Sequence, residues 1–158
     1  MSDLSSFSIF RSTLSRHSKL PAVADPLNNG YFRVRVGKQE IDVSWISPLQ
    51  LVDSNDEGSE PKQTVVLRRA IDKNQLFYAW RRRVAANLED RRPVRILHLD
   101  RPGDEGFPVN VFTLLAATPV RWTGPCFDAM QPDLALEEIE LSYHSLLWIQ
   151  LERADAER

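Results

Sequence analysis

Cysteine, histidine and long apolar runs are all scarce in this chain, and each shortage excludes a class of protein. The 158 residues include one cysteine, Cys126, and three histidines. A lone cysteine cannot form an internal disulfide, which predicts a reducing compartment. No apolar run approaches the ~20 residues needed to span a bilayer, and Met1 to Lys19 lack the continuous apolar core of a secretory signal. We therefore expect a soluble protein that is made in the cytoplasm and has no membrane partner.

Charge of either sign is also not in excess. The chain has 20 basic and 22 acidic residues, for a formal net charge of -2. This balance gives no global reason to expect nucleic acid or an anionic membrane as the partner. With 42% hydrophobic and 27% charged residues, the composition is that of an ordinary globular protein. The length favours one domain that is large enough to bury a core.

The stretch from Thr118 to Leu147 carries the clearest pattern that is present. Its first part, Thr118 to Pro125, reads as the end of an apolar strand followed by a Gly-Pro corner. Its second part alternates apolar residues with polar ones, as a half-buried strand does. The apolar set is Ile139, Leu141 and Tyr143, and the polar set is Glu138, Glu140 and Ser142. Neither part contains a nucleophile, a metal cluster or a phosphate loop, so the stretch favours an assembly subunit over an enzyme.

A β-hairpin is predicted near the start of the ordered region, which we expect to begin at Asp25-Pro26. Tyr31 to Val36 alternates apolar and polar residues, Gly37-Lys38 forms a turn, and Glu40 to Ile46 reads as the return strand. The polar, acidic segment Asp53–Lys62 then predicts a loop at the tip of a second hairpin, before a strand over 64–70.

One amphipathic helix follows. Asp72 is a predicted N-cap, because its carboxylate can accept hydrogen bonds from the first-turn amides. Leu76, Trp80, Val84 and Leu88 recur every four residues and predict an apolar stripe of about four turns.

Further strands are predicted over 94–100, 109–122 and 134–147, with a turn at 101–106. The fold class is therefore mainly β with one α-helix (α+β). We expect an antiparallel sandwich or barrel of about six to seven strands with the helix packed at one edge. The predicted domains are a flexible arm over 1–24, a β domain over 25–150 and a charged tail over 151–158. The apolar residues of the arm leave open a second role, docking on a neighbouring subunit.

Candidate chemical groups are few. His98, Asp100 and Asp104 lie close together in sequence, but no second histidine stands at ligand spacing, so we expect no metal site. Cys126 has no companion and is expected to pack as a small apolar group rather than act as a nucleophile. His144 is expected at the surface or an interface. The sequence thus predicts no catalytic residue and no cofactor.

The arginines of the predicted helix admit three interpretations. Arg81, Arg82 and Arg83 fall largely off the apolar stripe, and Arg91-Arg92 closes the segment. They could be a nucleic-acid patch or a solvated face. We favour a third interpretation, in which they meet acidic residues of a neighbouring subunit, such as Glu137, Glu138 and Glu140. The four tryptophans, Trp45, Trp80, Trp122 and Trp148, are expected in the core or at interfaces.

Four landmarks, taken in order, carry a resemblance to a known family. They are Asp25-Pro26-Leu27 before Tyr31-Phe32-Arg33-Val34, then Val66 to Asp72, then the helix with Leu76 and Trp80, then Pro119 to Pro125 before Glu138 to His144. Together they resemble the contractile-phage tail tube protein family, which includes tube subunits of phage-like extracellular injection systems. The resemblance covers about Asp25 to Ile149.

The resemblance implies a fold related to the haemolysin-coregulated protein of type VI secretion. It also implies that six copies close into a ring of the inner tube of a phage tail or injection particle, with tube, sheath or baseplate proteins as partners. The predicted intersubunit contacts are Arg81, Arg82, Arg83, Tyr31, Arg33, Arg35, Asp56, Glu57, Glu138 and Glu140. No specific nucleic-acid binding is expected.

One segment departs from the family pattern. The family usually has a longer stretch between the strands that match Glu40–Ile46 and Thr64–Ala70, whereas Leu49 to Gln63 is short and acidic here. This difference favours a ring next to the baseplate or cap. The alternative is a monomeric adaptor of the same fold that links the tube to the baseplate or cargo. An enzyme is the least favoured class, because no activated nucleophile or acid–base pair is present.

Overall fold

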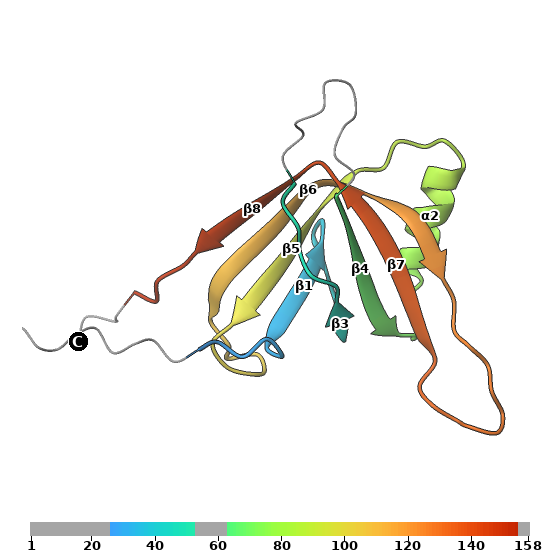
Figure 1. Ribbon diagram of the computed structural model, residues 1–158, viewed down its shortest axis with the longest axis horizontal. Helices are drawn as coiled ribbons and strands as arrows, with labels where there is room; N and C mark the ends of the chain where they lie inside the picture. The colour runs from blue at the N-terminus through green and yellow to red at the C-terminus, as the bar shows by residue number, and fades with distance from the viewer. Residues whose placement is uncertain (1–25, 53–62, 155–158) are drawn as a thin grey trace, which may run out of the picture.

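The computed structural model describes residues 26–52 and 63–154, and these residues form one curved antiparallel sheet with one helix (Figure 1). Strands make up 47% of the structure, which confirms the predicted mainly-β class with one helix. The elements are β1 (Phe32–Val36), β2 (Gln39–Ile41), β3 (Trp45–Ile46), β4 (Gln63–Ala70), α2 (Leu76–Ala85), β5 (Arg92–Leu99), β6 (Pro108–Thr123), β7 (Leu136–Tyr143) and β8 (Ser145–Gln150). The predicted arm 1–24 and the loop Asp53–Lys62, with Asp56 and Glu57, lie outside the described residues.

The sheet curls into an open barrel. Its strand order is β2-β1-β5-β6-β7-β4-β3, with β8 paired to β6 off this path. The two end strands, β2 and β3, are joined by residues 42–44 alone, so the two ends of the sheet lie close together. The β1–β2 hairpin turns through Gly37, whose φ of 60° is a conformation that glycine adopts without strain.

Strand β6 connects the two halves of the sheet. It is 16 residues long. Its first part pairs with β5 on one side and with β8 on the other, and its last part pairs with β7. The change of partner falls at Ala116, where the backbone φ is 53°. Strands β7 and β8 follow one another along β6 and are separated only by His144.

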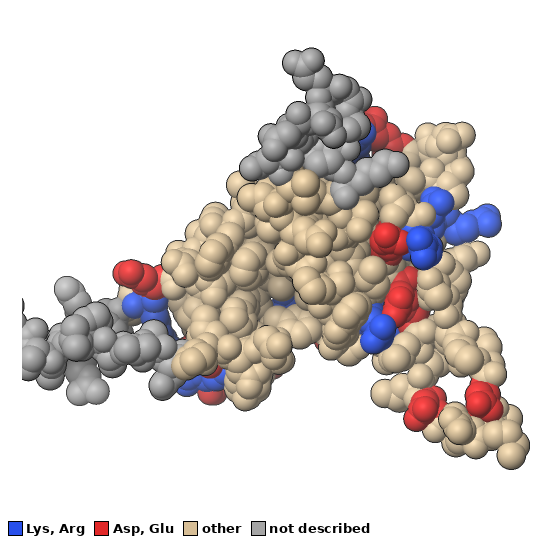
Figure 2. All heavy atoms as spheres, viewed as in Figure 1, with Lys and Arg blue, Asp and Glu red and all other residues tan. Residues whose placement is uncertain are grey.

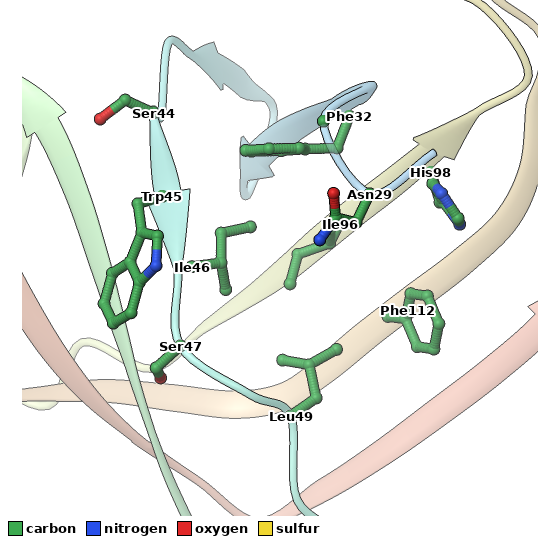
Figure 3. A pocket seen from close by; sticks show the side chains of 11 residues that line it. Asn29, Phe32, Ser44, Trp45, Ile46, Ser47, Leu49, Ile96, His98 and Phe112 are labelled. Carbon is green, nitrogen blue, oxygen red and sulfur yellow. The ribbon is translucent and has the colours of Figure 1, made fainter. Parts of the chain in front are cut away.

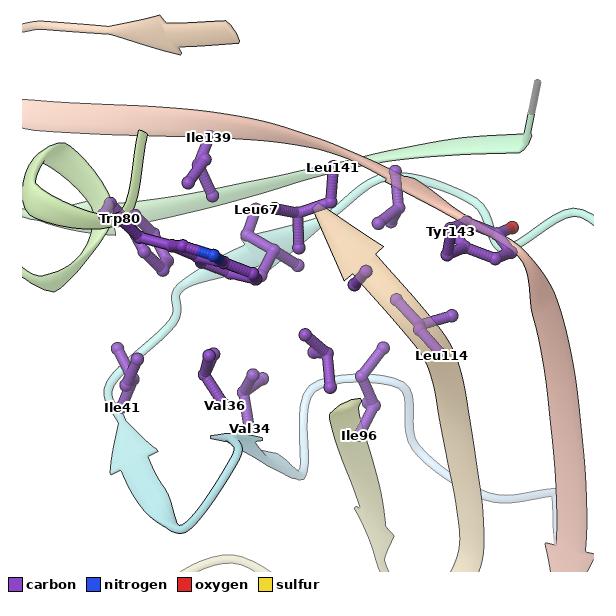
Figure 4. Packing of buried hydrophobic residues seen from close by; sticks show 14 residues of the cluster. Val34, Val36, Ile41, Leu67, Trp80, Ile96, Leu114, Ile139, Leu141 and Tyr143 are labelled. Carbon is purple, nitrogen blue, oxygen red and sulfur yellow. The ribbon is translucent and has the colours of Figure 1, made fainter. Parts of the chain in front are cut away.

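The core fills the inside of the curved sheet (Figure 4). Trp80 of α2 is fully buried and reaches in between Ile41 and Val36 on one side and Leu67 and Ile139 on the other (Figure 4). The helix therefore closes one end of the barrel, which agrees with the predicted packing of the helix at one edge. The rest of the core alternates along the strands, as in β7, where the inward residues are Glu137, Ile139, Leu141 and Tyr143.

Two predicted single strands are each divided. The predicted return strand Glu40–Ile46 is wrong as one element, because β2 pairs with β1 and β3 pairs with β4 on the other end of the sheet. The predicted strand 134–147 is likewise two, because His144 breaks it: its amide donates to the carbonyl of Leu115 between the two ladders. Both breaks lie where the chain passes from one half of the barrel to the other.

Helix α2 is shorter than predicted at both ends. Asp72 is not its N-cap, because its carboxylate accepts from the amide of Asn74 and pairs with Arg69, and the helix begins after Gln75. At the other end, Asn87 has a φ of 61°, which ends the helix. Leu88 therefore leaves the stripe and is 49% exposed. No helix within residues 26–52 and 63–154 is long and apolar enough to cross a membrane.

The single cysteine also differs from the prediction. Cys126 is exposed, so it does not pack as a small apolar group. It lies in the segment between β6 and β7, which leaves the body of the molecule at the lower right of Figure 1. The segment begins at Gly124-Pro125, directly after β6 ends at Thr123.

Candidate assembly surfaces

The outer edge of β8 is an unpaired strand edge within the described part of the chain. Strand β8 pairs with β6 alone, and its residues Leu147, Trp148 and Ile149 are 48%, 60% and 51% exposed. Free strand edges invite pairing with another chain, and natural proteins usually blunt them with charges or proline. Residues 145–150 include neither. This edge is therefore suited to join a neighbouring strand.

The backbone of β8 shows which amides are available at that edge. The amide of Leu151 donates to the carbonyl of Val109 at 2.9 Å, which places residue 151 in a hydrogen-bonded pair with β6. Because such pairs alternate along an antiparallel ladder, residues 147 and 149 also face β6. Trp148 and Gln150 then direct their amides and carbonyls to the open side.

Trp148 is held in place despite its exposure. Its ring stacks on Phe112 with the centroids 5.6 Å apart, and its indole N–H donates to Oδ1 of Asn110 at 2.9 Å. The Asn110 amide is 3.2 Å from Nδ1 of His98, whose Nε2 is 2.9 Å from the carbonyl oxygen of Asn28. The edge of β8 is therefore tied to the mouth of the barrel by one chain of polar contacts.

The mouth of the barrel contains an apolar pocket of about 490 Å³ (Figure 3). Ile46, Leu49, Phe32, Ile96 and Phe112 line it, and His98 lies at its side (Figure 3). Both ring nitrogens of His98 have protein partners, which the neutral tautomer with hydrogen on Nε2 satisfies. Among the residues that the structure describes, no group of three or more histidine, cysteine or acidic side chains is placed to hold a metal.

The predicted acidic contacts on β7 have partners within the chain. Glu138 lies opposite Arg68 of β4, with oxygen and nitrogen 2.6 Å apart, and Glu140 pairs with Arg121 of β6 at 3.3 Å. The Arg68 guanidinium also lies 4.5 Å from the centre of the Trp45 ring. Glu138 and Glu140 are on the outward face, as the sequence pattern predicts, and form a ladder of cross-strand ion pairs.

A buried ion pair lies on the inward side of the same strands. The Nε of Arg69 is 3.3 Å from Glu137, and the indole N–H of Trp122 donates to the same carboxylate at 2.7 Å. The sequence pattern predicted that Glu137 meets a neighbouring subunit and predicted no role for Arg69. The signal was present: Arg69 shares the inward alternation of Val65 and Leu67, and Glu137 shares that of Ile139.

The structure divides the three helix arginines into two groups. Arg83 is anchored within the chain by Asp90, at 2.9 Å, and Arg92 holds the same carboxylate at 2.8 Å. These hydrogen bonds, from Arg92 first and Arg83 second, lower the pKa of Asp90 below its ordinary value. Arg81 and Arg82 make no ion pair with the residues of 26–52 and 63–154. Instead they line a surface groove.

The predicted contacts on β1 and directly before it lie on a different part of the molecule. Arg33 donates to the carbonyl of Gly103 at 2.7 Å, so it fixes the β5–β6 turn. Arg35 is exposed and lies 3.5 Å from Glu40 across the β1–β2 hairpin. Tyr31 is half-buried beside β5, where its carbonyl accepts from the amide of Leu99. The predicted contact residues are therefore spread over several faces.

Known proteins place this chain in a family. No curated protein sequence matches it. The fold is similar to that of a chain in an extracellular contractile injection system, the PVC sheath–tube complex in the extended state. Identity is 22% and the TM-score 0.67, with 82% of this chain and 95% of that chain covered. The PVC sheath/tube terminator has 22% identity and a TM-score of 0.69, with 81% and 99% covered.

A further similar structure is Hcp1 from Flavobacterium johnsoniae, with 12% identity, a TM-score of 0.54, and 79% of this chain and 99% of that chain covered. These likenesses show the fold. Residues 56–147, more than half of the chain, match the family described as T4-like virus tail tube protein gp19. The chain belongs to the T4-like virus tail tube protein gp19 family.

Proposed function

We propose that six copies of this structural tail subunit close head to tail into a ring. The ring is part of the inner tube or lies at the tube's baseplate- or cap-proximal end. The observation that carries the proposal is the edge of β8, which is open, uncharged and apolar. A second copy that adds a strand there would pair its free amides and cover Trp148 and Ile149 at once. A heterologous contact of this kind gives a ring when its rotation closes.

The surface supports the same role. Figure 2 shows a broad face without charged side chains across the middle of the molecule, with the charged residues gathered at its sides. Depletion of charge is typical of the centre of a protein–protein interface. The family and the sheath–tube complex to which the fold is similar also support incorporation into a tail or injection particle. We infer that the subunit is made in the bacterial cytoplasm and performs no chemistry.

A monomeric adaptor of the same fold is the second candidate. The shortness of Leu49 to Gln63 favours it, because a longer segment would be available to contact a stacked ring. In this reading residues 25–150 form the binding domain, and the arm 1–24 and the tail 151–158 flank it.

Solution mass separates the two candidates. Purified protein is measured by light scattering over a range of concentrations, and the same fractions are imaged in negative stain. Rings of about six copies are expected for the tube role, since closed homo-oligomers have a defined number of subunits. A monomer at every concentration would overturn self-assembly into a ring and leave the adaptor.

A further inference from the structure

The segment 124–135 between β6 and β7 exposes apolar side chains to an unusual degree. Phe127, Met130 and Leu134 are 86%, 88% and 78% exposed, the highest values among the large apolar side chains of the described residues. Several such residues on one short segment are typical of an interaction site rather than of ordinary surface. The segment also carries Asp128 and Asp133 and no basic residue. It is both apolar and acidic.

A groove beside α2 has the opposite charge. It has a volume of about 340 Å³ and is lined by Tyr78, Arg81, Arg82, Ala85, Val120, Arg121 and Trp122. Its floor is aromatic, since Tyr78 and Trp122 meet edge to face with their centroids 5.2 Å apart. Tyr78 and Val120 remain 42% and 44% exposed. No acidic side chain lines it, and Arg81 and Arg82 have no ion-pair partner in the described part of the chain.

The two surfaces adjoin at one end only, where Gly124 lies against the Trp122 ring: a Cβ at this position would be 2.8 Å from it. The segment leaves the end of β6 and extends away from α2 before it returns to β7 (Figure 1). Figure 2 shows acidic and no basic side chains on this projection, and basic side chains gathered over α2. A second copy must therefore bring them together, in a contact that uses a different surface on each partner.

We propose that the 124–135 segment of one copy docks in the α2 groove of the next copy. Phe127 and Met130 pack on Tyr78 and Trp122, and the two aspartates face Arg81 and Arg82. Pro125 and Pro132 restrict the backbone of the segment, which lowers the entropy lost when it docks. The proposal rests on the proposed self-assembly and names one of its contacts, which is separate from the β8 edge.

A pair of charge-reversed proteins tests this contact. One carries Asp128→Lys and Asp133→Lys, and the other carries Arg81→Glu and Arg82→Glu. When either variant is present alone, the segment and the groove of neighbouring copies carry charges of the same sign. We therefore expect its self-association constant to fall at least about tenfold below that of the wild type. Mixed in equal amounts, they restore opposite charges at every contact, and a ring of alternating copies closes for an even number such as six.

Sedimentation at several hundred micromolar gives the readout for each protein, the mixture and the wild type. A mixture that is heavier than either variant alone supports the contact, whether or not the wild type forms rings. Equal masses for the variants and the mixture would overturn it. A monomeric wild type would instead overturn the ring. Thermal unfolding checks that each variant is folded. If a double variant does not fold, the single variants Asp133→Lys and Arg82→Glu form the charge-reversed pair instead.

Discussion

Arg69 of β4 and Glu137 of β7 lie directly opposite each other across the two strands, with both side chains inside the barrel. Their exposed fractions are 1% and 4%. The neighbouring pair on the outer face, Arg68 and Glu138, has the same chemistry and register but is about one-third exposed on both sides, at 38% and 34%. The two pairs lie on the same two strands and differ in burial, and Arg69 has Asp72 as a second, exposed ionic partner.

Removal of one partner should destabilise the fold far more in the buried pair than in the exposed pair. Arg69→Met leaves the Glu137 carboxylate buried with the Trp122 indole N–H as its remaining hydrogen bond. We expect a loss of about 3–5 kcal/mol in the free energy of unfolding, because an uncompensated buried charge is strongly destabilising. The control Arg68→Met should cost about 1 kcal/mol or less. Urea unfolding followed by tryptophan fluorescence measures both.

The double variant Arg69→Met/Glu137→Leu sharpens this comparison. It removes both charges, so it should be more stable than Arg69→Met alone. Equal losses for Arg69→Met and Arg68→Met would contradict the idea that burial sets the difference.

Asp90 should make stability depend on pH. Hydrogen bonds from Arg92 and Arg83 lower the pKa of its carboxyl in the folded protein, so its contribution is present above the unfolded value of about 3.9 and is lost as the pH falls through the folded value. Asp90→Asn should therefore cost about 1–2 kcal/mol at pH 7. The difference from the wild type should shrink as the pH falls below about 4.

Urea midpoints across this pH range test the prediction. Asp42→Asn is the control, because the Asp42 carboxylate is exposed and forms no ion pair with the other described residues. A constant difference between Asp90→Asn and the wild type at all pH values would show that the charge of Asp90 is not what stabilises the fold.

Gly106 is required by space rather than by backbone angle. A Cβ at this position would lie 2.4 Å from the carbonyl oxygen of Arg101, in the turn between β5 and β6. Because the opposing atom is backbone, the turn itself must move, and Gly106→Ala should cost about 1–3 kcal/mol. In the control Gly30→Ala, the new Cβ meets the end of the flexible Asn28 side chain at 3.0 Å. If both changes lower the thermal unfolding temperature equally, this explanation is ruled out.

The two hydrogen-bonding edges of β8 should respond differently to proline. Gln150→Pro removes an amide that points to the open side, so it should leave the fold intact and reduce self-association. Ile149→Pro removes an amide that faces β6, so it should lower the unfolding temperature of the subunit itself. Light scattering and circular dichroism measure the two effects. Assembly of Gln150→Pro at the wild-type level would exclude the β8 edge as the ring contact.

Local patterns in the sequence predicted much of this fold. The Gly37-Lys38 turn, the strand over 64–70, the alternation of β7 and the apolar face of α2 with Phe77 and Trp80 all depend on neighbouring residues. The division of Glu40–Ile46 between two strands depends instead on which distant strand each half meets. No local period carries that information.

The surfaces were harder to predict for a related reason. A run of arginines such as Arg81 to Arg83 does not show that Asp90 will hold one of them and leave two in a groove. Likewise, Phe127 and Met130 read as ordinary loop residues and Leu134 as the start of a strand, until the structure shows all three exposed. Their roles in assembly remain predictions.

The span of β6 across both halves of the barrel has a consequence for how the subunit opens. Its first ten residues, Pro108 to Ala117, complete the ladder with β5, and its last ones complete the ladder with β7. Neither half retains a full set of strands if β6 leaves, so we expect the two halves to unfold as one cooperative unit. Amide hydrogens of Val94 on one side and Ile139 on the other should then exchange with solvent through the same opening event.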